Sequence, residues 1–279
     1  MVVATPGKSY LSSIGLQLWT VRDQIEHDLP GTLRAIKAAG YAQIELMRTL
    51  QARDVVQPAR ELGLGVTSAF IEWSLLAQPV PDRSDELART VAFGREIGLK
   101  YLVFGYIGKG ARETIAQMKT HAARANAFGR QCRDAGIQLC YHHHSFEFAP
   151  LDDGHTTGWE IFVNEFDPLL VQFEIDVFWA AIAGLDPIRL LRDLRGRVAQ
   201  VHLKDLKPGS AMNRDEGAVP PDAFKELGRG CLDLRQILVT CAETGVAQCH
   251  VEQDQSPDPL ASIAVSLNFL RQLSLNPQP

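Results

Sequence analysis

Short apolar runs of strand character alternate with longer segments of helical period along nearly the whole chain. Each return from one strand to a parallel neighbour needs a helical crossover, so this order predicts a parallel sheet. About eight strand–helix units fit a closed α/β barrel better than an open doubly wound sheet. The predicted fold class is therefore α/β, a single-domain (β/α)₈ TIM barrel. The expected strands are 14–18, 42–46, 64–69, 101–104, 137–142, 171–175, 198–203 and 247–251, and the expected helices are 30–39, one ending at 62, 84–97, 112–135, 157–166, 186–194, 232–244 and 257–273.

The chain shows no linker-like segment that would divide the barrel. We expect residues 1–13 to form an N-terminal tail and residues 14–279 to form one domain. The tail lacks the charged start, apolar centre and cleavage site of a signal peptide. The short glycine pattern Gly63–Leu64–Gly65 leads into a strand, whereas a dinucleotide-binding turn must leave one.

Composition narrows the range of partners and compartments. A net charge of −5 over 279 residues argues against binding to nucleic acid, which requires clustered lysine and arginine. No apolar run is long enough to cross a bilayer, so no membrane partner is expected. The five cysteines are widely spaced and form no CxxC pair, which predicts reduced, buried thiols in a cytoplasmic protein.

Acidic and histidine residues gather where the expected strands end. In a barrel of this kind the active site lies at the C-terminal ends of the strands. Taken singly, each residue is explained as well by a surface or capping role. Together, buried acids must be paired or must bind a cation, and carboxylates with imidazoles suit Mn²⁺, Zn²⁺, Co²⁺ or Mg²⁺. The residues are Glu45, His142, His143, His144, Glu147, Glu174, Asp176, His202, Lys204, Asp205, His250, Glu252 and Asp254.

Seven segments resemble the xylose isomerase-like TIM-barrel superfamily of sugar phosphate isomerases and epimerases. They are IGLQLWTVRD, LPGTLRAIKAAGYAQIEL, GIQLCYHHHSFEF, EIDVFW, VHLKD, ELGRGCLDL and HVEQD, and they cover nearly the whole chain. The last five together are typical of the superfamily, without selecting one member. The resemblance implies a small carbohydrate substrate and one divalent metal ion.

In that superfamily Glu, Asp, His and Glu from successive strand ends typically hold the metal. By position, Asp176, His202 and Glu252 match the last three ligands. The fifth strand leaves the first ligand open between Glu147, which we favour, and His142 or His144, which otherwise contact substrate. The residue His143 stands where the related pattern has Asn.

These residues predict proton transfer next to a carbonyl group. A divalent cation on adjacent carbonyl and hydroxyl oxygens acts as a Lewis acid and stabilises an enediolate. A carboxylate removes the α-proton, and epimerisation needs groups on both faces of the substrate, for which Glu147 and Glu252 are the natural pair. Lys204 either stabilises the developing oxyanion or forms an ion pair with neighbouring carboxylates.

Other residues after strand ends are candidates for substrate contact. Trp19 and Trp179, with Phe70 and Trp73, either wall the pocket or belong to the core. Glu45, His142 and His144 are further substrate-binding candidates. Arg22 meets an anionic group or forms a surface ion pair. The long loop 207–230 is either the edge or lid of the site or a contact in a homo-oligomer.

The same site supports more than one activity. Loss of water or an alcohol from a keto-sugar or keto-inositol begins with the same proton abstraction, so a dehydratase or lyase is the alternative to an isomerase or epimerase. The substrate is expected with or without a phosphate, because no phosphate-binding glycine loop follows the seventh or eighth strand. A DNA-repair endonuclease on this fold needs a basic groove, which the acidic balance disfavours. A barrel that binds metal or sugar without catalysis is the remaining alternative.

Overall fold

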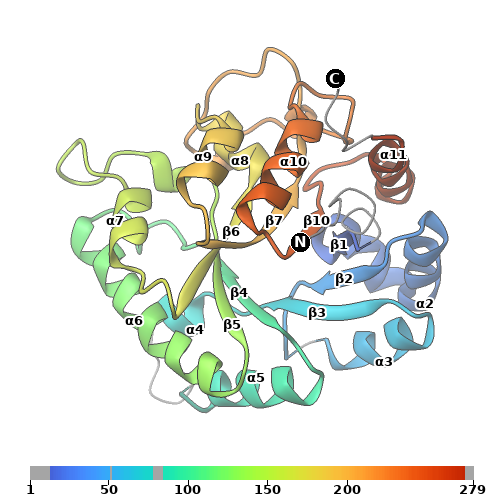
Figure 1. The fold of residues 1–279 in the computed structure, drawn as a ribbon, viewed down its shortest axis with the longest axis horizontal. Coiled ribbons are helices and arrows are strands. Elements are labelled where there is room, and N and C mark those ends of the chain that lie inside the picture. The colour runs from blue at the N-terminus through green and yellow to red at the C-terminus, as the bar shows by residue number, and fades with distance from the viewer. Residues whose placement is uncertain (1–12, 51, 78–83, 274–279) are drawn as a thin grey trace, which may run out of the picture.

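Eight parallel strands close into a barrel in the computed structural model, which describes residues 13–50, 52–77 and 84–273. The order around the barrel is β1-β10-β7-β6-β5-β4-β3-β2, and the helices lie outside it (Figure 1). The predicted fold class is confirmed. The expected tail lies outside the described residues except for Ser13. The barrel strands are β1 (Gly15–Gln17), β2 (Gln43–Leu46), β3 (Gly65–Phe70), β4 (Tyr101–Gly105), β5 (Gln138–His142), β6 (Val171–Asp176), β7 (Val198–Leu203) and β10 (Gln248–Val251).

The helices begin and end at residues whose chemistry favours those positions. Thr114 and Thr157 form capping boxes with the residues three positions on, Gln117 and Glu160. Gly40 closes its helix with a φ of 101°, a conformation that costs glycine little. The helices are α2 (Arg22–Ala39), α3 (Arg53–Glu61), α4 (Ser74–Ala77), α5 (Ser84–Glu96), α6 (Ile115–Asp134), α7 (Gly158–Glu165), α8 (Val177–Ile182), α9 (Pro187–Asp193), α10 (Leu234–Thr244) and α11 (Pro259–Gln272).

The first helix is longer than the sequence pattern predicts. It begins at Arg22, while the expected helix covers only its second part, 30–39. A kink at Asp28 separates the two parts, because Pro30 has no N–H to donate to the carbonyl four residues earlier and its ring would clash there in a continuous helix. The Asp28 carboxylate accepts a hydrogen bond from the Gly31 amide at 2.9 Å, as an N-cap does at the start of a new helix.

The segment expected as one long loop, 207–230, contains short regular elements. Two 3₁₀ turns, η4 (Glu216–Ala218) and η5 (Pro221–Ala223), precede strand β9 (Phe224–Lys225). This strand pairs antiparallel with β8 (Asp205–Leu206). The Asp205 carboxylate accepts hydrogen bonds from the amides of Gly228, Gly230 and Leu232, so the far end of the segment is fixed to the end of the barrel.

The barrel strands present different chemistry on their two faces. On β6, Phe173 and Ile175 join the main apolar core, whereas Glu174 and Asp176 alternate with them and carry buried carboxylates. The aromatic ring of Phe173 lies 4.9 Å from that of Trp159 on α7 (centroid to centroid), so this face packs against the helical layer. Within the described ranges, no helix is both long and apolar enough to cross a membrane.

Candidate metal centre

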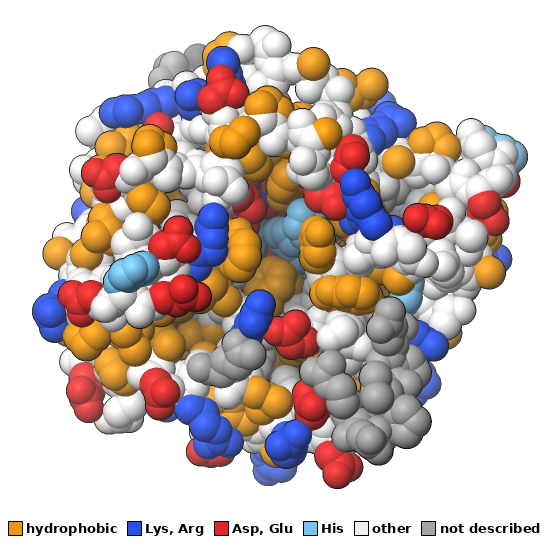
Figure 2. Space-filling model, turned by 180° about the vertical axis from the view of Figure 1, so that it is seen from behind, with side chains coloured by type: hydrophobic (Ala, Val, Ile, Leu, Met, Phe, Trp, Pro, Cys, Tyr) orange, Lys and Arg blue, Asp and Glu red, His pale blue; other side chains and the backbone are white. Residues whose placement is uncertain are grey.

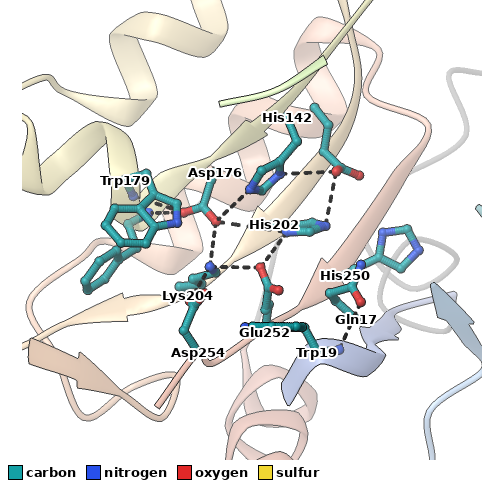
Figure 3. Close-up of polar contacts among 12 residues, drawn as sticks. Gln17, Trp19, His142, Asp176, Trp179, His202, Lys204, His250, Glu252 and Asp254 are labelled. Carbon is teal, nitrogen blue, oxygen red and sulfur yellow. Dashed lines mark hydrogen bonds and ion pairs between the residues drawn. The ribbon is translucent and has the colours of Figure 1, made fainter. Parts of the chain in front are cut away.

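Four buried side chains from four neighbouring strands converge at the C-terminal end of the barrel (Figure 3). His142 ends β5, Asp176 ends β6, His202 lies near the end of β7, and Glu252 directly follows β10. One potential ligand atom from each lies within 4.8 Å of the others. The strand register places Asp176 beside His202, so parallel pairing itself brings these side chains together.

The Asp176 carboxylate has one engaged oxygen and one that faces the group. Its Oδ1 accepts hydrogen bonds from the amides of Phe178 and Trp179 and so caps α8. Its Oδ2 is buried, lies 3.0 Å from the Lys204 ammonium, and is 4.0 Å from both His142 Nε2 and His202 Nδ1. Two imidazoles and two carboxylates whose ligand atoms converge in this way fit a divalent cation.

Lys204 lies beside the group and forms ion pairs with its carboxylates. Its Nζ is 3.0 Å from Asp176 Oδ2 and 2.8 Å from Glu252 Oε2, and it also pairs with Asp254. Burial alone would lower the pKa of this lysine, but the surrounding carboxylates raise it above its usual value. Lys204 is therefore protonated, and the ion pair considered from the sequence is present.

Negative charge is in excess around this centre. The side chains of Glu45, Glu174 and Asp176 are completely buried, and Glu252 is nearly so. Burial, together with the charge of Glu45, raises the pKa of Glu174 to about 8. Burial also opposes ionisation of Glu252, but Lys204 and His202 outweigh it and hold its pKa below the usual range. With Glu174 protonated, the other three carboxylates carry three negative charges, which Lys204 and a divalent cation together would balance.

The structure brings Asp176, His202 and Glu252 together and places Glu147 elsewhere. Glu147 lies in the 3₁₀ turn η3 (Phe146–Phe148), where Tyr141 Oη donates to its Oε1 at 2.5 Å and the His144 amide to its Oε2 at 2.9 Å. Burial raises the pKa of Glu147 to about 8. The first position of the four-residue group, for which the sequence favours Glu147, is taken by His142.

The other two histidines of the HHH segment have different surroundings. His143 accepts a hydrogen bond from the Asp176 amide at Nε2, so its Nδ1 carries the proton that is donated to the His144 carbonyl. It thus braces the backbone of β6. The His144 ring lies 5.3 Å from that of Trp179 and 5.5 Å from that of Tyr106, and its buried Nδ1 has no hydrogen-bond partner among the described residues.

Figure 2 shows a hollow in one face of the molecule, with histidine and acidic side chains at depth and hydrophobic side chains around it. Trp19, in the 3₁₀ turn η1 (Leu18–Val21), is 42% exposed, and Trp179 is buried beside Lys204, whose Nζ lies 5.4 Å from its ring centroid. The Phe70 ring lies 5.4 Å from that of His142, whereas Trp73 packs against the main core. Among the aromatic residues suggested from the sequence, Trp19 is therefore the most exposed.

Two candidate residues have contacts that the sequence does not predict. Arg22 stacks over the Trp19 ring and donates to the carbonyl oxygens of Trp19 and Asp254, and it forms no ion pair with the described residues. Its contact with an anionic group stays a prediction. Glu45 lies below the four-residue group, where Gln17 and Ser68 also donate to it. Gln17 and Ser68 could have been found as inward-facing polar residues on their strands.

Tyr106 is a further residue that sequence reasoning missed. It follows β4, is 48% exposed and has a φ of 60°, which is uncommon for a residue with a side chain. Its ring lies near the ring of His144, and the Arg112 guanidinium forms a cation–π contact with it. No motif marks this residue, because its importance rests on backbone conformation and exposure.

The model of the xylose isomerase-like TIM barrel family matches residues 33–273. The chain belongs to this family. It is 27% identical to the inosose dehydratase of Clostridium botulinum (strain Alaska E43 / Type E3), over 72% of this chain and 74% of that protein. It is 25% identical to the rhizopine catabolism protein MocC of Rhizobium meliloti, over 90% of this chain and 85% of that protein. The crystal structure of a sugar phosphate isomerase/epimerase from Parabacteroides distasonis ATCC 8503 superposes with a TM-score of 0.75 at 20% identity, covering 94% of this chain and 99% of that one, and thus shares the fold.

Proposed function

We propose that the protein is a divalent-metal-dependent isomerase or epimerase of a sugar, a sugar phosphate or a related polyol. The observation that carries this proposal is the buried group of His142, Asp176, His202 and Glu252, whose potential ligand atoms lie within 4.8 Å of one another. The reaction begins with removal of a proton next to a carbonyl group. We place the enzyme in the cytoplasm, where four of its five cysteines would stay buried and reduced.

His142, Asp176, His202 and Glu252 would hold the cation, which when bound supplies Lewis acidity toward adjacent carbonyl and hydroxyl oxygens. Glu252 is kept ionised by Lys204 and His202, so it is able to accept the α-proton. Lys204 carries a positive charge next to Glu252 and would stabilise negative charge that develops on a substrate oxygen. Trp19 would bound the substrate at the mouth of the hollow.

A metal-dependent dehydratase or lyase is the second candidate. It is supported by the named relatives, of which inosose dehydratase acts, by its name, on a keto-inositol. Elimination requires the same base, followed by departure of a hydroxyl or alkoxyl group from the neighbouring carbon. The structure encloses Glu147 between Tyr141 and His144, so a two-glutamate exchange of protons across the substrate has less support than a reaction that starts at Glu252 alone.

The test follows the proton and the product in one assay. The protein is purified without chelator and incubated in D₂O with a panel of ketoses, ketose phosphates and keto-inositols. Deuterium in recovered substrate or in an epimeric product supports the isomerase or epimerase. A new ultraviolet chromophore, from an enone or dicarbonyl product, supports the dehydratase or lyase.

The control variant is Glu96→Gln, which makes the same chemical change at an exposed position on α5. It should behave as the wild type, whereas Glu252→Gln should lose both signals. If the protein binds metal and sugar but neither exchanges protons nor forms product with any member of the panel, a barrel that binds without catalysis is the correct description.

A further inference from the structure

Two buried carboxylates lie directly below the proposed metal centre, on the side away from the substrate hollow. Glu45 is on β2 and Glu174 is on β6, and both side chains are completely buried. Glu45 Oε2 is 2.7 Å from His202 Nε2, and Glu174 Oε2 is 3.2 Å from His142 Nδ1. Glu174 Oε2 also lies 3.3 Å from His202 Nε2, so Glu45 contacts one histidine of the centre and Glu174 contacts both.

The same two histidines face the centre with their opposite ring nitrogens. His142 Nε2 is 4.0 Å from Asp176 Oδ2, and His202 Nδ1 is 2.8 Å from Glu252 Oε2. His142 therefore lies between Glu174 below and the candidate metal group above, and His202 lies between that group and both Glu45, its nearer partner, and Glu174. The two rings use different nitrogens for this purpose, since His142 enters from β5 and His202 from β7.

An imidazole binds a metal ion only through a nitrogen that carries a lone pair. A neutral imidazole has one such nitrogen and one N–H, and an ionised carboxylate can only accept hydrogen bonds. A cation bound above the rings would favour the ionised form of nearby carboxyls, including Glu174. An ionised carboxylate beneath each ring would then keep the proton on the lower nitrogen and leave the lone pair on the upper one. Without that partner, either nitrogen could carry the proton.

We infer that Glu174 and Glu45 are positioning residues of the metal centre: Glu174 holds the His142 proton on Nδ1, and Glu45 holds the His202 proton on Nε2. This inference rests on the proposed function, because it assumes that a cation binds above the two rings. Carboxylates behind metal-bound histidines commonly raise the basicity of the ligand and fix the orientation of its ring. Glu45, which the sequence suggests as a substrate contact, would then act through His202.

The two carboxylates are held to different degrees. Glu45 also accepts hydrogen bonds from Gln17 Nε2 at 2.7 Å and from Ser68 Oγ at 2.5 Å, so its orientation is determined by three donors. Glu174 Oε1 has no hydrogen-bond partner in the described part of the chain. Replacement of Glu174 therefore disturbs fewer neighbours and gives the cleaner test.

A second cation below the rings is the competing explanation. His250 lies in this layer with both ring nitrogens buried and without hydrogen-bond partners among the described residues, and it could join Glu45, Glu174 and His202 in a separate group. A cation there would have to displace the proton shared by His202 Nε2 and Glu45. The number of ions bound per chain separates the two explanations.

The test measures Zn²⁺ affinity and the histidine tautomers of the full-length protein. Zn²⁺ binding by competition with a chromogenic chelator should be about 10- to 100-fold weaker in Glu174→Gln than in the wild type. Glu174→Asp, which keeps the carboxylate, should recover part of the affinity. Glu216→Gln is the matched control, because Glu216 is a nearly buried carboxylate that pairs with Arg112 outside the centre. The Zn²⁺ affinity of this variant should equal that of the wild type.

Nitrogen-15 NMR of the zinc-loaded wild type should show His142 protonated at Nδ1 and His202 protonated at Nε2. Glu174→Gln should bind one zinc ion weakly, with a melting temperature close to that of the wild type. An affinity within threefold of the wild type would overturn the positioning role while leaving the proposed metal centre intact. A second ion that disappears in Glu174→Gln would show a lower cation site instead. Absence of any zinc binding by the wild type would overturn both the inference and the proposed function.

Discussion

The outer and inner faces of the barrel strands are both buried but carry side chains of different chemistry. On β6 the outer residues Phe173 and Ile175 join the main apolar core, and Phe173 packs on aromatic rings of the α7 region. The inner residues Glu174 and Asp176 are equally buried, yet Glu174 Oε1 has no hydrogen-bond partner among the described residues and Asp176 Oδ2 faces the Lys204 ammonium. The same strand thus combines complete packing on one side with incomplete polar pairing on the other.

This difference separates stability from function. Burial of apolar surface stabilises the fold by roughly 25 cal/mol per Å². Burial of carboxylates opposes folding unless they are paired or bind a cation. The outer face therefore accounts for the stability of the barrel, and in the proposed function the inner face lowers stability in exchange for metal binding. Substitutions on the two faces should consequently alter different measurements.

The largest effect is expected at the inner face, from Glu252→Gln. The change removes the proposed proton acceptor and one metal ligand, so deuterium exchange into substrate should fall by at least about 10²- to 10⁴-fold. The melting temperature should remain close to that of the wild type, because no apolar contact is lost. Exchange at the wild-type rate would contradict the role of Glu252.

The outer face is tested by Phe173→Ala. Removal of this completely buried ring should lower the free energy of unfolding by about 3–5 kcal/mol. The free energy of unfolding is measured by denaturation with urea. The metal affinity is measured separately, on the fraction of the variant that remains folded. That affinity should be unchanged. A large loss of metal affinity in the folded protein would show that the two faces are not independent.

A third comparison decides between the two candidates for the first ligand. His142→Ala should weaken metal binding by more than about 100-fold. Loss of a residue that only hydrogen-bonds to a metal ligand already costs about 10- to 100-fold, and loss of the ligand itself should cost more. Glu147→Gln should leave metal affinity unchanged, since its carboxylate lies outside the four-residue group. The opposite ranking, measured by chelator competition, would restore Glu147 as the ligand.

The smallest effect concerns the pH dependence of stability. The pKa of Glu147 is raised by burial to about 8 in the folded protein, above the ordinary value of 4.5. Between these values the folded state binds more protons than the unfolded state, so its stability falls as pH rises, by about 1.4 kcal/mol per pH unit. Glu147→Gln should flatten the stability curve between pH 6 and pH 8. Parallel curves for the variant and the wild type would contradict a buried, protonated Glu147.

The sequence predicted the barrel because the pattern is periodic and repeated. Each expected strand overlaps an observed one, and for β7 the bounds 198–203 coincide. Helix ends were less accurate, as at α2, where Asp28 and Pro30 divide one helix into two parts. The capping role of Asp28 can be recognised only once the position of the kink is known.

The site was only partly predictable. Alternation along a strand shows which residues face inward, so Asp176, His202 and Glu252 could be grouped before the structure was considered. The depth of a side chain within the barrel depends on the register between strands, and this places Glu45 below the centre. The choice between His142 and Glu147 depends on the turn after β5, whose path no periodic pattern specifies.

The most direct test of the proposed metal centre is the metal content of the wild type and of Asp176→Asn. The asparagine keeps an oxygen that can cap α8 but removes the negative charge that faces the group. After reloading with Mn²⁺ and removal of excess metal, the wild type should retain about one ion per chain and the variant almost none. Equal metal content in both proteins, or none in the wild type under any loading condition, would contradict a metal centre at the C-terminal end of the barrel.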